Sequence, residues 1–166
     1  MEIINSNAQD FDAIMHLYDL AVEYQKTKFN KHWKPFDTAM IKREIAENKQ
    51  FKIIIDNQIA AIFAIAFEDP FIWNDIEPSI FLHRIVTNPD FRGQNFVEKI
   101  ADWAKDYGKK LGLKYIRMDT WGDNQSLIEY YQKCGFKFLG IITPKASDTL
   151  PLHYNSITLS LFEIKI

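Results

Sequence analysis

The sequence contains little that would suit an oxidising, membrane or nucleic-acid environment. It has one cysteine in 166 residues and a net charge of only −2. A lone cysteine, Cys134, cannot form an internal disulfide, which is typical of a reducing compartment. The weak charge disfavours a bulk electrostatic grip on nucleic acid. The longest apolar stretch, 53–67, is interrupted by Asp56-Asn57-Gln58 and is too short to favour a membrane span. The first residues lack the pattern of a signal peptide, so we predict a cytoplasmic protein.

Several sequence motifs of other enzyme classes are also missing. The four histidines, His16, His32, His83 and His153, show no metal-ligand spacing, so no metal is predicted. There is no Walker-type phosphate loop and no dinucleotide glycine fingerprint, which disfavours a kinase or an oxidoreductase. What the chain does contain is 47% apolar and 25% charged residues, the balance of a globular protein. Its length suits a single domain, 1–166.

Apolar periodicity and turn residues predict alternating helices and strands. Asn7 and Asp37 are candidate helix caps, and Asp56-Asn57 tolerates the left-handed backbone of a hairpin turn. The expected fold is a mixed, mostly antiparallel central sheet of about seven strands flanked by about four helices, an α/β layered class. The last strand is expected at an exposed edge, where it could support a homodimer. The predicted strands are 2–5, 51–55, 59–67, 80–87, 114–120, 136–142 and 153–162, and the predicted helices are 8–27, 38–48, 95–110 and 125–133.

The most informative segment is Arg92-Gly93-Gln94-Asn95-Phe96-Val97. It follows a predicted strand and the turn Asn88-Pro89-Asp90, and it precedes an amphipathic helix. The N–H groups at a helix N-terminus are unpaired and carry partial positive charge, so they favour an anion. Arg92 adds a forked donor that matches phosphate oxygens. This order of strand, basic turn and helix is typical of a phosphate-binding loop.

Two segments in the second half resemble the GNAT N-acetyltransferase superfamily. The first runs from Ile85 to Val97 and is similar to the family's strand, turn and pyrophosphate loop. The second, from Asn124 to Phe136, is similar to its Asn-x-x-Ala/Leu…Phe-Tyr-x-x-x-Gly-Phe signature. Their order and spacing fit as well. The resemblance is strong from Ile80 to Gly140 and topological before that, and it implies a GNAT-like fold.

The resemblance implies acetyl-CoA as cosubstrate and a primary amine as acceptor. The N–H groups of 93–97 would hold the diphosphate, and strand 85–87 would pair with the pantetheine amides. Strands 80–87 and 114–120 would be neighbours that splay apart to admit the thioester. Tyr131 would protonate the leaving thiolate, and Asn124 would cap its helix and touch the coenzyme. The full set assigned to coenzyme binding is Ile85, Val86, Thr87, Arg92, Gly93, Gln94, Asn95, Phe96, Val97, Asn124 and Tyr131.

One departure from the family pattern motivates a second hypothesis. Asn95 and Val97 replace the two small residues of the usual pyrophosphate loop. Glycine takes left-handed dihedrals at little cost, and asparagine is among the better substitutes for it. A GNAT-fold domain that binds acyl-CoA as a sensor, with little or no turnover, is therefore the alternative. A generic interaction domain would require both motif matches to be coincidence.

The sequence leaves the general base and the acceptor open. His83 lies two residues before Ile85, so strand alternation would put both on one face, at a place where the family often has glutamate. Loop acids Glu68, Asp69, Asp75 and Glu77 are alternatives. The acceptor site is expected from the first two helices, segment 68–78 and loop 143–152, and the acceptor itself is either a small-molecule amine or a peptide or protein amine. Its candidate residues are Trp33, Glu68, Trp73, Asp119 and Trp121, with Phe36 and Phe71 as further aromatic candidates.

Overall fold

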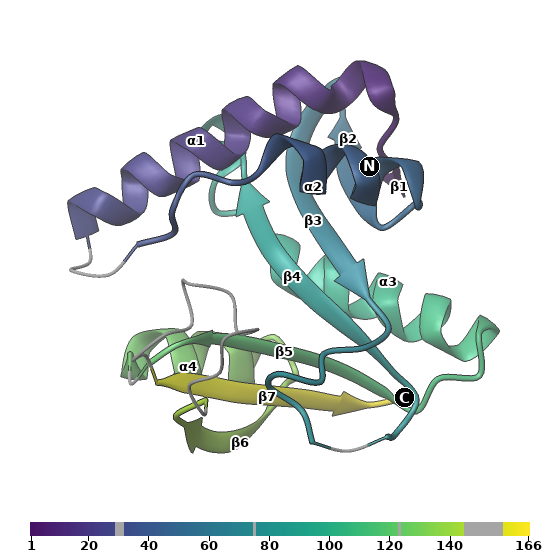
Figure 1. The fold of residues 1–166 in the computed structure, drawn as a ribbon, viewed down its shortest axis with the longest axis vertical. Helices are drawn as coiled ribbons and strands as arrows, with labels where there is room; N and C mark the ends of the chain where they lie inside the picture. The colour runs from purple at the N-terminus through teal and green to yellow at the C-terminus, as the bar shows by residue number, and fades with distance from the viewer. Residues whose placement is uncertain (29–31, 75, 123, 145–157) are drawn as a thin grey trace. The chain divides into compact units, whose positions relative to one another are not determined.

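The computed structural model describes residues 1–28, 32–74, 76–122, 124–144 and 158–166 (Figure 1). Strands and helices follow one another in the predicted order β-α-α-β-β-β-α-β-α-β-β. The strands are β1 (Glu2–Asn5), β2 (Gln50–Ile55), β3 (Gln58–Ala66), β4 (Ser79–Thr87), β5 (Tyr115–Trp121), β6 (Lys137–Ile142) and β7 (Leu159–Lys165). The helices are α1 (Phe11–Lys28), α2 (Thr38–Ala46), α3 (Phe96–Lys110) and α4 (Gln125–Lys133), and short 3₁₀ turns at Ala8–Asp10 and Pro89–Phe91 precede α1 and α3.

The seven strands form one mixed sheet in the order β1-β2-β3-β4-β5-β7-β6. β4 and β5 are parallel, whereas β1–β2, β2–β3, β5–β7 and β7–β6 are antiparallel. The predicted fold class is thereby confirmed. The prediction of an exposed last strand was wrong, because β7 lies between β5 and β6 and pairs with both. Its backbone groups are used inside the sheet, so β1 and β6 are the edge strands, and β7 cannot pair with a second copy along an open edge.

Local sequence chemistry explains where most elements begin and end. The Asp37 side chain accepts the Ala39 N–H at 2.9 Å and caps α2. At the β2–β3 hairpin, Asp56 and Asn57 have φ of 49° and 60°, the left-handed turn that their types predict. Gly135 follows α4 with φ of 93°, as expected for a helix stop. The first helix begins with a 3₁₀ turn capped by Asn7, so its α-helical part starts later than predicted.

The chain divides into two compact units, each with its own packing. The first comprises 1–65 and 84–94. In it the apolar faces of α1 and α2 pack on β3 and the end of β4, because their apolar residues recur at helical spacing. The buried members of this core are Ile14, Leu17, Tyr18, Ile41, Ile45, Ile62 and Val86.

The second unit comprises 66–83 and 95–166. Here α3 packs against β5 and α4 against β6. The buried side of α3 carries Val97, Ile100, Ala101 and Ala104, which confirms the predicted amphipathic helix. A separate apolar cluster joins Ile72, Trp73, Phe81 and Leu159. That the whole chain is one domain stays a prediction.

The last predicted strand is described only in part. Residues 153–157 lie outside the described residues, and β7 runs from Leu159 to Lys165, three residues beyond the predicted end. Within the described residues, no helix combines the length and the apolar character needed to cross a bilayer.

Candidate active site

The parallel pair β4–β5 brings His83 and Asp119 together. The ladder aligns Ser79 with Tyr115 and Phe81 with Arg117. His83 lies two residues beyond Phe81, and Asp119 lies two residues beyond Arg117. Because side chains alternate along extended strands, each lies on the same face of its strand as the last paired residue before it. The ladder therefore brings an imidazole and a carboxylate to equivalent positions just past its last pair.

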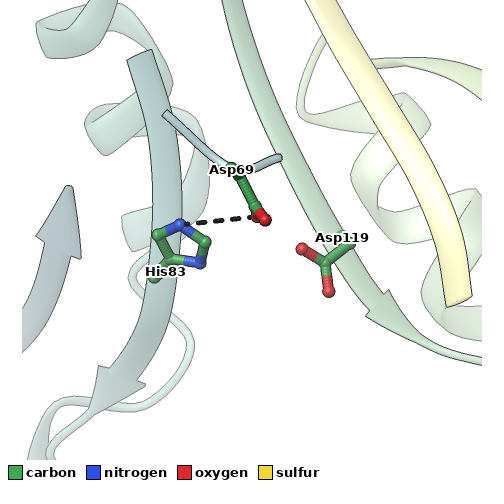
Figure 2. Close-up of side chains that lie close together, drawn as sticks. All are labelled: Asp69, His83 and Asp119. Carbon is green, nitrogen blue, oxygen red and sulfur yellow. Dashed lines mark ion pairs between the residues drawn. The ribbon is translucent and has the colours of Figure 1, made fainter. Parts of the chain in front are cut away.

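Asp69 joins them from the loop between β3 and β4. The loop turns tightly there, since the N–H groups of Ile72 and Trp73 both donate to the Asp69 carbonyl. Asp69 Oδ2 lies 3.9 Å from His83 Nε2, and one ligand atom from each of Asp69, His83 and Asp119 lies within 4.8 Å of the other two. Figure 2 shows the three side chains pointing toward one another from loop, β4 and β5. The exposed fractions of the Asp69 and His83 side chains are only 10% and 20%.

Burial perturbs both carboxyl groups of this cluster. Desolvation raises the pKa of Asp69 to about 6, opposed by a hydrogen bond from the Ile72 backbone. Desolvation also raises the pKa of Asp119 to about 7, and the nearby Asp69 carboxylate raises it further. No lysine or arginine among the described residues forms an ion pair with either acid. At pH 7 the Asp69 carboxyl, with a pKa of about 6, is therefore mostly ionised, whereas the Asp119 carboxyl, with a pKa of about 7, is still about half protonated.

Tyr131 lies in the same unit, on α4. Its ring packs 5.1 Å from that of Phe162, and Asn124 caps the same helix by accepting the Leu127 N–H at 3.2 Å. Burial raises the pKa of the Tyr131 hydroxyl well above 10; Tyr130, Cys134 and Asp119 add to the rise, and a hydrogen bond with the Thr120 side chain opposes it. The hydroxyl therefore stays protonated at neutral pH, which suits a proton donor but makes it a weak one.

Arg84, directly after His83, was not identified from the sequence. Its φ of 48° is the left-handed conformation, which is rare for arginine inside a strand. Its Nη2 donates to both Glu44 carboxylate oxygens at 2.6 and 2.5 Å, and its Nε to the Tyr18 hydroxyl at 3.4 Å. This left-handed residue breaks simple alternation along β4. The expectation that His83 and Ile85 share a face assumed an extended backbone throughout, and it stays a prediction.

The predicted phosphate-binding loop is divided between the two units. In the first, the Arg92 guanidinium lies 4.8 Å above the Tyr24 ring, and Gly93 has φ of 80°. In the second, Asn95 takes φ of 53° and ψ of 45° at the N-cap of α3. Val97 is buried, with a relative exposed area of 8%. The two departures from the family pattern thus retain a left-handed N-cap and a helix start with a packed apolar face, which weakens the motive for the sensor hypothesis.

The remaining predicted coenzyme contacts fall on β4 and on the segment from β4 to the start of α3. Val86 is buried in the core of the first unit, so only its backbone could serve a ligand, and Ile85 and Thr87 are half-buried. Gln94 is exposed. Phe96 is buried and begins α3.

The predicted acceptor residues fall in both units. Trp33 packs in the core of the first unit, with its ring 5.5 Å from that of Phe36. In the second unit, Trp73 is buried beside Phe81 and Trp121 packs on the same cluster. Glu68 is exposed, and with Asp69 it borders a cavity of about 310 Å³. Asp75 and loop residues 145–152 lie outside the described residues. Of the five predicted acceptor residues, only Asp119 belongs to the cluster with Asp69 and His83. From the sequence, Asp69 was one of several alternative general bases.

The comparisons with known proteins agree with this architecture. Residues 14–136 match the family model described as "Acetyltransferase (GNAT) family". The chain belongs to the GNAT family. It is 25% identical over 142 residues to the uncharacterized N-acetyltransferase YesJ of Bacillus subtilis strain 168. The aligned residues cover 80% of this chain and 79% of that protein. A 56-residue segment is 32% identical to the uncharacterized N-acetyltransferase MJ1207 of Methanocaldococcus jannaschii, covering 34% of this chain and 25% of that one.

Solved GNAT structures share the fold over nearly the whole chain. A GNAT-family acetyltransferase from Listeria monocytogenes 4b F2365 superposes with a TM-score of 0.78 at 19% identity, covering 99% of this chain and 94% of that one. The putative acetyltransferase yncA from Salmonella typhimurium, solved with its cofactor acetyl-CoA, gives 0.67 at 12% identity, covering 99% and 92%. Members of the GNAT family use acetyl-CoA and acetylate amines. This GNAT protein is accordingly an N-acetyltransferase.

Proposed function

We propose that this enzyme moves the acetyl group of acetyl-CoA to a primary amine by direct attack on the thioester. The observation that carries the proposal is the cluster of His83, Asp69 and Asp119, with Tyr131 electrostatically coupled to Asp119 in the same unit. An imidazole flanked by carboxyl groups is a suitable proton acceptor, and a buried tyrosine is a suitable donor. A base and an acid are the two groups that this transfer requires.

In the proposed reaction, His83 takes a proton from the acceptor ammonium and the free amine attacks the thioester carbonyl carbon. A C–N bond forms, the C–S bond breaks, and the electron pair leaves on sulfur. Tyr131 donates its hydroxyl proton to that thiolate, giving coenzyme A. The tyrosinate then regains a proton, and His83 releases the one it took. No covalent acyl-enzyme is needed, which fits the absence of a role for Cys134, a buried residue whose pKa is raised by desolvation.

Coenzyme binding is proposed to use backbone groups in the main. The first N–H groups of α3, at Asn95, Phe96 and Val97, have no acceptor within the helix, so they can donate to diphosphate oxygens. Arg92 and the backbone of 85–87 are the further contacts that the family resemblance implies. The cosubstrate would be acetyl-CoA, and no metal takes part in the proposed steps.

The test is a thiol-release assay with acetyl-CoA and a panel of amines, run with His83→Gln and the matched variant His16→Gln, whose residue is exposed on α1. We expect His83→Gln to slow amine-dependent release at pH 7 by about a hundredfold. The deficit should shrink as pH rises toward the pKa of the amine, because more acceptor is then already neutral. His16→Gln should match the parent. A deficit independent of pH would contradict the assignment of His83 as base.

If the parent enzyme binds acetyl-CoA but no amine of the panel increases thiol release, transfer to an amine is contradicted.

A further inference from the structure

The spacing of the cluster leaves room for a cation between its three ligand atoms. A tetrahedral metal ion with bonds of about 2.1 Å draws its ligand atoms to about 3.4 Å from one another. An ammonium nitrogen with charge-assisted hydrogen bonds of about 2.8 Å leaves its acceptors about 4.6 Å apart. Here His83 Nε2 and Asp69 Oδ2 are 3.9 Å apart, and the three ligand atoms lie within 4.8 Å of one another. The 3.9 Å between His83 Nε2 and Asp69 Oδ2 lies between these two values, so the spacing admits an ammonium group as well as a metal ion, and a titration must distinguish them.

The number and type of acceptors suit an ammonium group. A primary alkylammonium has three N–H donors, and the cluster offers two carboxylates and an imidazole nitrogen on three separate elements, as Figure 2 shows. No lysine or arginine among the described residues pairs with the two carboxyl groups, so a protonated amine would supply the missing positive charge. Its binding would favour ionised Asp69 and Asp119, whose protonated forms are otherwise favoured by burial.

The surroundings of Asp69 accommodate the carbon part of such a ligand. Asp69 borders the cavity of about 310 Å³, whose walls include Phe67, Trp73 and Phe81. Aromatic walls suit the methylene groups of an alkyl chain. Glu68 and Glu77 also border this cavity. The Glu77 carboxylate pairs with Lys114 Nζ at 2.8 Å. The aromatic part of the wall therefore suits an alkyl substituent on the ammonium group.

We propose that Asp69, Asp119 and His83 form a three-acceptor site for the charged, primary alkylammonium form of the acceptor. Asp69 and Asp119 are binding residues, and His83 both accepts one hydrogen bond and takes that proton before attack. This inference rests on the proposed function for the last step only, because binding of the cation requires no transfer. The site selects alkylamines, which are protonated near neutral pH, over arylamines, which are not.

The test measures binding by calorimetry with coenzyme A present, so that no acetyl group can be transferred. The probes are pentylamine, its N-methyl, N,N-dimethyl and N,N,N-trimethyl derivatives, and 1-pentanol. Charge is constant along the four amines while the number of N–H donors falls from three to none. We expect affinity to fall by about tenfold for each N–H lost and 1-pentanol to show no measurable binding. Equal affinity for all four amines would overturn the three-acceptor site.

Variants assign the acceptors. Asp69→Asn and Asp119→Asn should each weaken pentylamine binding at least tenfold and flatten the dependence on N-methylation. The matched control is Asp102→Asn, on the surface of α3 with 68% of its side chain exposed, which should bind as the parent does. Unchanged affinity in both cluster variants would overturn the proposal. Chromatography and circular dichroism would show whether each variant is folded before binding is measured.

Two arms separate this inference from its competitors. Titration with Co²⁺ in place of amine should give no ligand-field absorption, and a visible band lost in Asp69→Asn would show a metal site and overturn the ammonium site. Graded pentylamine binding without acetyl transfer would uphold the site while contradicting the proposed transfer to this amine. Transfer to an arylamine at the same kcat/KM as to pentylamine would uphold the transfer and overturn the site.

Discussion

The ion pair between Arg84 and Glu44 offers a direct test of how the first unit is held together. Arg84 Nη2 reaches both Glu44 oxygens at 2.5 to 2.6 Å, and the side chains are only 17% and 18% exposed. Replacing Glu44 with glutamine keeps the shape and removes the charge. Arg84 would then be a nearly buried cation with neutral partners, because its other contacts are the Tyr18 hydroxyl and the Phe36 ring.

Breaking a buried pair in this way typically costs 3 to 5 kcal/mol. We expect about 3 kcal/mol for Glu44→Gln, the low end, since nearly a fifth of each side chain still meets solvent. Urea unfolding followed by circular dichroism would measure it as a midpoint lowered by about 1 to 3 M, because urea slopes for small proteins are about 1–3 kcal/mol per molar.

The matched control is Glu23→Gln, which removes the same charge from a pair of similar length. Glu23 and Lys26 are 2.6 Å apart on α1, with side chains 68% and 44% exposed, so solvent screens them and the expected loss is at most about 0.5 kcal/mol. Adding Arg84→Met to Glu44→Gln removes the stranded cation and should recover part of the loss. Equal destabilisation by the two glutamine variants, or a strictly additive double variant, would refute the reasoning.

Four further predictions concern the site. Tyr131→Phe should lower kcat while acetyl-CoA affinity, measured by calorimetry, stays within about twofold, with Tyr107→Phe on α3 as control; an unchanged rate under chemistry-limited conditions would remove the acid assignment. Arg92→Ala should weaken acetyl-CoA binding before it affects kcat, by about tenfold, and an unchanged dissociation constant would show that the guanidinium makes no coenzyme contact. Because burial raises the pKa of Asp119 from 3.8 to about 7, its contribution to stability is full below pH 4 and is lost as pH rises through 7; Asp119→Asn should therefore be more stable than the parent at pH 8 but not at pH 4, and equal differences at both would contradict the shift. Asn95→Gly should keep acetyl-CoA affinity within about threefold, whereas a large gain would show that the asparagine side chain obstructs the coenzyme.

Short-range patterns predicted most of the elements. The bounds of α4 match the prediction at both ends, because Asn124 caps it and Gly135 follows it, and both signals are local. The β2–β3 hairpin was predictable for the same reason. The position of β7 was not, since its pairing with β5 depends on strands far apart in sequence and leaves no local trace.

The residues of the candidate site likewise differ in how far local sequence predicts them. The motifs identified Tyr131 and His83 as candidates because residue type and neighbouring sequence sufficed. Asp69 was only one of four possible loop acids, since the path of a loop is set by tertiary packing and not by its composition. Arg84 was missed altogether, because its left-handed backbone contradicts the propensity of its residue type and is held by contacts with Glu44 and Tyr18 from other elements.

The loop at the start of α3 shows why a departure from a motif need not change the chemistry that the motif serves. A small residue there meets two separate demands, a left-handed backbone and a close helix start. Asn95 meets the first with φ of 53°, which its short polar side chain tolerates, and makes no side-chain capping bond to the helix. Val97 meets the second by joining the buried face of α3. An anion at a helix N-terminus is held by backbone N–H groups, and these are the same whichever side chains flank them. The two substitutions therefore alter side chains at positions where the proposed ligand would contact the backbone.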